Sequence, residues 1–123
     1  MKKLIIVLVL LLAATALFGQ AIQLGGAFPS AKFLDAKNDA VWEFSANNIR
    51  ILDSKTGDLA WDFAGKTIQD FRTAMDGRQA VVTFSCPEAG RSYSFKTALP
   101  ATDLVMEITR SDLPKYTVTM PKQ

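Results

Sequence analysis

The chain has 123 residues, of which 49% are hydrophobic and 21% are charged, with 14 Lys and Arg against 12 Asp and Glu. This length and apolar content favour one folded domain and exclude an intrinsically disordered chain. No basic run or stripe is present, so the electrostatic footprint of a nucleic-acid-binding protein is missing.

The first 21 residues have the layout of a secretory signal peptide. Lys2 and Lys3 provide a positive start, and an apolar stretch covers residues 4–18. Small residues allow cleavage after Ala16 or after Ala21. Because the stretch is shorter than the ~20 apolar residues that span a bilayer, we expect cleavage rather than a retained membrane anchor. The sequence therefore predicts an exported protein, periplasmic or extracellular, with no transmembrane span after cleavage.

Removal of the signal peptide would change the net charge of the chain, and the single cysteine limits its disulfide cross-links. Loss of Lys2 and Lys3 leaves 12 basic against 12 acidic residues. A single cysteine, Cys86, allows no internal disulfide, so packing must stabilise the domain. Cys86 shares its strand face with Val82 and Phe84, which predicts a small buried hydrophobe rather than a reactive thiol. An intermolecular disulfide is the alternative.

Residues 22–40 show no clear hydrophobic period and contain Gly25-Gly26 and Pro29. We expect an N-terminal segment that packs on one end of the core. Phe28, Phe33 and Leu34 are its expected anchors.

From residue 41 onward, apolar and polar residues alternate in short runs, as in half-buried β-strands. The expected strands are 41–45, 49–51, 59–63, 82–86, 92–96, 104–109 and 116–120. In the third of these, Leu59, Trp61 and Phe63 are predicted to share the inward face. Asp76-Gly77 has the composition of a hairpin turn, and Pro87 should end the fourth strand because it cannot donate to a ladder.

The segment 66–72 is ambiguous, because Ile68 and Phe71 are three residues apart. A β-bulge would restore the two-residue period by adding one residue to a strand. A short helical turn is the alternative, and the closely flanking strands favour the bulge.

Seven or eight short strands with short connections predict an all-β fold. We expect an antiparallel meander over residues 41–123, closed as a small barrel. A β-sandwich is the alternative, since both architectures impose the same alternation.

The chemistry available for catalysis is limited. The chain has no histidine and no Cys-x-x-Cys motif, which removes the usual general base and the commonest metal ligands. We therefore expect no cofactor, no metal, no catalytic residues and no enzymatic activity. The carboxylates Glu43, Asp58, Asp62 and Glu107 are expected on solvated strand faces. The remaining enzyme hypothesis would use Asp62 or Cys86.

The strand Val41-Trp42-Glu43-Phe44-Ser45, the meander after it, and the late runs 91–96 and 102–110 resemble the lipocalin and fatty-acid-binding β-barrels in a short bacterial exported form. The resemblance implies a closed barrel with a pocket for a small hydrophobic ligand. It also implies a structural pair in which Trp42 packs across the closed end of the barrel against Arg110.

The sequence thus predicts an exported, lipocalin-like binding protein, with a small hydrophobic ligand inside the barrel. The candidate ligand-binding residues are the bulky inward side chains Trp42, Phe44, Trp61, Phe63, Phe84, Tyr93, Phe95 and Met106. In the alternative, these side chains fill the interior themselves. The domain would then bind a protein or an envelope component through its loops, as an inhibitor does.

Overall fold

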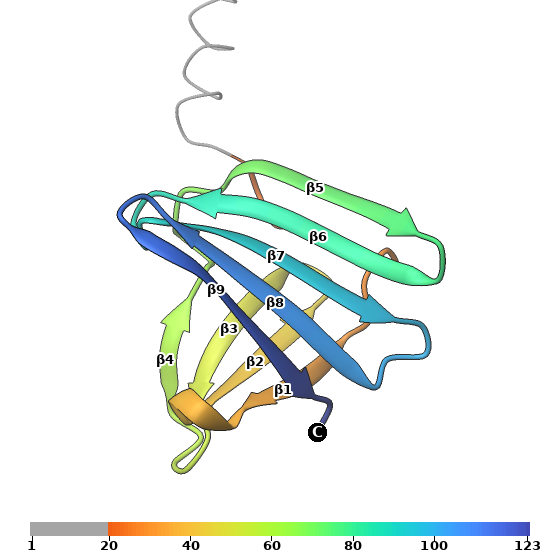
Figure 1. The fold of residues 1–123 in the computed structure, drawn as a ribbon, viewed down its shortest axis with the longest axis horizontal. Helices are drawn as coiled ribbons and strands as arrows, with labels where there is room; N and C mark the ends of the chain where they lie inside the picture. The colour runs from red at the N-terminus through yellow and green to blue at the C-terminus, as the bar shows by residue number, and fades with distance from the viewer. Residues whose placement is uncertain (1–19) are drawn as a thin grey trace, which may run out of the picture.

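The computed structural model describes residues 20–123, so the predicted signal peptide lies outside the described residues except for Gln20 and Ala21. Nine strands and one short 3-10 helix, η1, follow one another along this part of the chain (Figure 1). In chain order they are β1 (Ala31–Asp35), η1 (Ala36–Asn38), β2 (Ala40–Ser45), β3 (Asn48–Asp53), β4 (Leu59–Asp62), β5 (Gln69–Asp76), β6 (Gln79–Cys86), β7 (Arg91–Ala98), β8 (Asp103–Arg110) and β9 (Leu113–Pro121).

The strands form two antiparallel sheets, with the orders β1-β2-β3-β4 and β5-β6-β7-β8-β9 (Figure 1). At one side the sheets touch through an isolated bridge between Phe33 and Lys122. At the other side β4 and β5 are not paired. The all-β antiparallel prediction is confirmed, but the closed barrel is wrong, and the arrangement is consistent with the β-sandwich alternative.

The link between β4 and β5 explains why the barrel does not close. Phe63 and Ile68 of this link are only 1% and 2% exposed. Gly65, at a φ of +81°, turns the chain between them, a conformation that glycine adopts without strain. The link itself therefore covers the core where the edges of β4 and β5 would have to meet, and both edges stay unpaired.

The alternation that predicted the strands is clearest in β6, β7 and β8. Val82, Phe84 and Cys86 are buried along β6, with half-buried residues between them. Phe84 lies opposite Tyr93 of β7, and Phe95 lies opposite Met106 of β8. Pro87 follows the end of β6 as expected. These strands present one apolar face to the other sheet.

Residues 22–40 contain a strand that the sequence pattern did not predict. β1 pairs with β2 along its whole length, and Phe33 lies opposite Trp42. Before β1, the backbone N–H groups of Leu24 and Gly25 donate to the carbonyl of Ala46, at 2.8 and 2.9 Å. Ile22, Leu24 and Phe28 are buried there, so the segment packs over the β2–β3 turn. Leu34 is half-buried.

Two bulges decide which side chains face inward. In β5, Asp70 and Phe71 together lie opposite Phe84, and Asp70 has a φ of +55°. This confirms the bulge predicted in the segment 66–72. In β4, Ala60 is the extra residue, and Leu59 is consequently 52% exposed. The prediction that Leu59 faces inward is therefore wrong.

Candidate functional site

The space between the sheets holds a cluster of aromatic side chains. Phe44 and Phe95 approach each other from the two sheets, with ring centroids 5.1 Å apart. Phe63 lies 5.3 Å from Phe84 and 5.4 Å from Tyr93. All five rings are at most 4% exposed. Five of the eight predicted ligand-binding residues thus pack against one another.

Beside this cluster lies a cavity of about 420 Å³ that we call the Trp42 cleft. Ala40, Trp42 and Ile51 line it from the β1–β4 sheet, and Met106, Ile108 and Tyr116 line it from β8 and β9. Asp35, Lys37, Asn38, Arg91 and Arg110 complete its lining. Of the predicted residues, the cleft unites Trp42, Met106 and Arg110.

Trp42 connects the cleft to the aromatic cluster. Its ring lies 5.5 Å from that of Phe95 and 5.9 Å from that of Tyr93, and only 4% of the residue is exposed. Burial raises the pKa of Tyr93, and the nearby Arg91 guanidinium opposes this shift. Trp42 thus packs against the aromatic cluster and lines the cleft with only a small exposed surface.

A polar network closes one side of the cleft. Asp35 is 2% exposed, and its carboxylate accepts hydrogen bonds from the backbone N–H and the side-chain amide of Asn38, at 3.3 and 2.8 Å. The same amide donates to the hydroxyl of Tyr116 at 3.1 Å. The ammonium of Lys37 lies 5.4 Å from the centroid of the Tyr116 ring. These contacts join η1 to β9, two elements that are far apart in sequence.

Arg110 lies at the end of β8 and lines the same cleft as Trp42. Its Nε is shielded from solvent and has no hydrogen-bond partner among residues 20–123. The predicted structural pairing of Trp42 with Arg110 stays a prediction, although both residues line one cavity.

Trp61 lies away from the cleft. It is half-buried, its ring is 6.0 Å from that of Phe63, and the ammonium of Lys66 sits 4.7 Å from its centroid. Its indole Nε1 is shielded and has no partner in the described part of the chain. Trp61 does not line the Trp42 cleft, but it lies opposite the lining residue Ile51 in the neighbouring strand.

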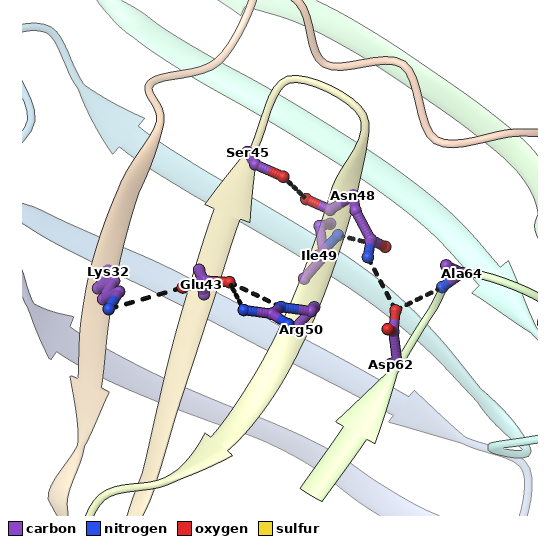
Figure 2. Close-up of polar contacts among 8 residues, drawn as sticks. All are labelled: Lys32, Glu43, Ser45, Asn48, Ile49, Arg50, Asp62 and Ala64. Carbon is purple, nitrogen blue, oxygen red and sulfur yellow. Dashed lines mark hydrogen bonds and ion pairs between the residues drawn. The ribbon is translucent and has the colours of Figure 1, made fainter. Parts of the chain in front are cut away.

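The carboxylates on the outer face of the β1–β4 sheet are held in structural contacts (Figure 2). Glu43 accepts a hydrogen bond from Arg50 Nε at 2.7 Å and forms an ion pair with Lys32 at 3.6 Å. Asp62 accepts from the side-chain amide of Asn48 at 2.8 Å and from the Ala64 backbone at 2.9 Å. The Asn48 and Ala64 hydrogen bonds hold the pKa of Asp62 below its usual value. The general acid of a glycosidase requires a raised pKa instead.

The remaining predicted positions are also placed. Glu107 forms an ion pair with Lys115 at 3.4 Å, and Asp58 is exposed. Cys86 is free and 0% exposed, and its Sγ lies 3.9 Å from a carboxylate oxygen of Glu88. Burial on the inward face of β6 agrees with the interpretation of Cys86 as a small hydrophobe.

Within the described residues, no helix is both long enough and apolar enough to cross a bilayer. In the same part of the chain, no group of three or more His, Cys, Asp or Glu side chains is placed to hold a metal ion. Comparison of the chain with protein-family models, with curated proteins and with solved structures found no match.

Proposed function

We propose that this chain is an exported, non-enzymatic binding protein that holds a small, mainly apolar ligand in the Trp42 cleft. The observation that carries the proposal is the contrast between a packed aromatic interior and an open cavity beside Trp42. This is the role that the resemblance to lipocalins implies, transferred from a barrel interior to a space between two sheets.

The size and lining of the cleft support this role. Small-molecule sites commonly have volumes of about 300–1,000 Å³, apolar walls and a few convergent polar groups. The cleft has about 420 Å³, with Trp42, Met106 and Ile108 as apolar lining and Asn38 and Arg110 among the polar groups. An apolar molecule placed there would remove mainly its own surface from water, because Trp42, Met106 and Ile108 are only 4%, 1% and 6% exposed.

A neutral dye tests the proposal. N-phenyl-1-naphthylamine fluoresces weakly in water and strongly in apolar surroundings, and we expect a saturable rise in its emission with the mature protein. Ala40→Phe places a ring in the cleft and should weaken binding at least about fivefold, roughly 1 kcal/mol. Ala60→Phe is the matched control, since Ala60 is exposed on β4 and does not line the cleft.

Dye binding that Ala40→Phe and Ala60→Phe reduce equally would contradict the location. Wild-type protein that is folded and shows no saturable emission would contradict the function. That second result would favour the alternative, a filled domain that binds a protein or envelope component through its loops.

A further inference from the structure

Three cationic side chains line the Trp42 cleft, and they come from three separate elements. Lys37 belongs to η1, Arg91 begins β7 and Arg110 ends β8. Asp35 is the one acidic residue of the lining. The cleft therefore carries an excess of two positive charges, although the mature chain as a whole is close to neutral.

The cleft cations have no carboxylate partner among residues 20–123. The ion pairs of that range use Lys32, Arg50, Lys55 and Lys115 instead. Figure 2 shows one of these ion pairs, that of the Arg50 guanidinium with Glu43, whose N···O distance is 2.6 Å. Four of the twelve Lys and Arg residues in the described range form ion pairs, and the three cations of the cleft are among the eight that do not.

Asp35 supplies the one negative charge of the lining, but its carboxylate is hydrogen-bonded by Asn38 and forms no ion pair with Lys37, Arg91 or Arg110. The backbone and side-chain N–H groups of Asn38 donate to its two oxygens at 3.3 and 2.8 Å. With 2% of Asp35 exposed, these hydrogen bonds satisfy a carboxylate that is otherwise removed from water. Asp35 positions η1 rather than pairing with an arginine.

Arg110 provides the most specific observation. Its Nε–H is shielded from solvent without an acceptor in the described residues. A buried donor left unsatisfied lowers the stability of the fold, and more so when it is charged. Because this Nε has no accessible surface, the guanidinium would have to turn toward the cleft to bind an anion there with two parallel hydrogen bonds, and in doing so it would satisfy the donor.

We propose that the ligand of the Trp42 cleft is amphipathic, with an apolar body and one carboxylate or phosphate group. The anionic group accepts hydrogen bonds from Arg110 and is attracted by Arg91 and Lys37. The apolar body lies against Trp42, Met106 and Ile108. This inference rests on the proposed function and names the chemical class of its ligand.

Calorimetric titration with three probes of one shape tests the inference. The probes are 2-naphthoate, 2-naphthyl phosphate and the neutral 2-naphthalenemethanol. The wild-type protein should bind at least one anion about tenfold more tightly than the neutral probe, and the tighter anion identifies the preferred group. Raising the salt concentration should weaken binding of the anions and leave the neutral probe unchanged.

Arg110→Met keeps much of the side-chain volume and removes the charge. It should reduce the preference for the anions at least about fivefold, with a remainder due to Arg91 and Lys37, and leave the affinity for the neutral probe within about twofold, since the apolar walls stay. Arg78→Met is the matched control, because Arg78 lies in the exposed β5–β6 turn and does not line the cleft. This control should behave like the wild type.

Equal binding of all three probes by the wild type, independent of salt, would overturn the inference and leave the proposed function standing. Equal effects of Arg110→Met and Arg78→Met would do the same. Failure of all three probes to bind would overturn the proposed function and the inference together. The wild-type comparison does not depend on the folding of any variant.

Discussion

Phe95 occupies the centre of the contact between the two sheets, and its removal should be among the most destabilising single changes in the chain. The residue is 0% exposed. Its ring lies 5.5 Å from Trp42 and 5.1 Å from Phe44 across the interface. Within its own sheet it lies 6.0 Å from Phe84 and 5.9 Å from Tyr93.

The magnitude follows from these contacts. Truncation of a buried Phe to Ala costs about 3–5 kcal/mol. Aromatic pairs contribute about 0.5–1.5 kcal/mol each beyond the area they bury. Because Phe95 takes part in four such pairs, we expect Phe95→Ala to lie at the upper end, about 4–5 kcal/mol. That is a large share of the roughly 5–15 kcal/mol that stabilises a domain.

Urea unfolding followed by fluorescence and by circular dichroism measures this loss. Phe71→Ala is the matched control, since Phe71 is half-buried at the bulge of β5 and has one aromatic neighbour in the described chain, Phe84 at 6.4 Å. We expect it to cost less than half as much. Equal losses for the two variants would refute the view that a shared aromatic cluster holds the sheets together.

Two further predictions concern the N-terminal segment and pH. A chain that begins at Ile22 instead of Gln20 loses the hydrogen bonds that Gln20 makes with the Ile68 carbonyl at 2.6 Å and the Phe71 N–H at 2.7 Å. Urea unfolding should show it about 1–3 kcal/mol less stable, and equal stability would contradict the role of Gln20. The lowered pKa of Asp62 means that its contribution to stability is present above its unfolded value of 3.8 and is lost as the pH falls through the folded pKa. Asp62→Asn should therefore be less stable than the wild type at pH 6 and approach it at pH 2.5, and a gap that stays constant would count against this origin.

Alternation predicted most of the strands because a single buried face imposes a period of two. It missed β1, where the half-buried Leu34 follows the buried Phe33 and weakens the alternation. Residues 31–35 form a strand because they pair with the next strand, β2. The hydrophobic pattern of residues 31–35 alone does not show this pairing. The bulge at Ala60 turns Leu59 outward. The bulge is a feature of the pairing between β4 and β3, and the hydrophobic period of the sequence does not show it.

The barrel prediction failed because closure depends on the edges of the sheets and not on their faces. The alternation would be the same in both architectures. Between β4 and β5 lie the buried link through Phe63 and Ile68 and also Gln20, which is hydrogen-bonded to Ile68 and Phe71. The sequence signal for an open edge here would have been the link after β4. It follows a strand of only four residues and contains Gly65 between the apolar residues Phe63 and Ile68.

The candidate site was predicted in part. Trp42 and Met106 were chosen for their inward faces, and both line the cleft. Asn38 and Tyr116 were not candidates, although a hydrogen bond joins them across 78 residues of sequence. Asp35-x-x-Asn38 is a local capping pattern that could have indicated η1, but its contact with β9 follows only from the fold.

The two tryptophans provide the most direct test of a ligand site in the Trp42 cleft, because the chain contains only Trp42 and Trp61. In a two-dimensional ¹H–¹⁵N spectrum of the mature protein, each should give one resolved indole N–H signal. On titration with 2-naphthoate, we predict that the Trp42 signal shifts and saturates, and that its shift is larger than that of the Trp61 signal, since Trp42 lines the cleft and Trp61 does not. A Trp61 signal that moves while that of Trp42 is unchanged, or two signals that never move, would contradict the account.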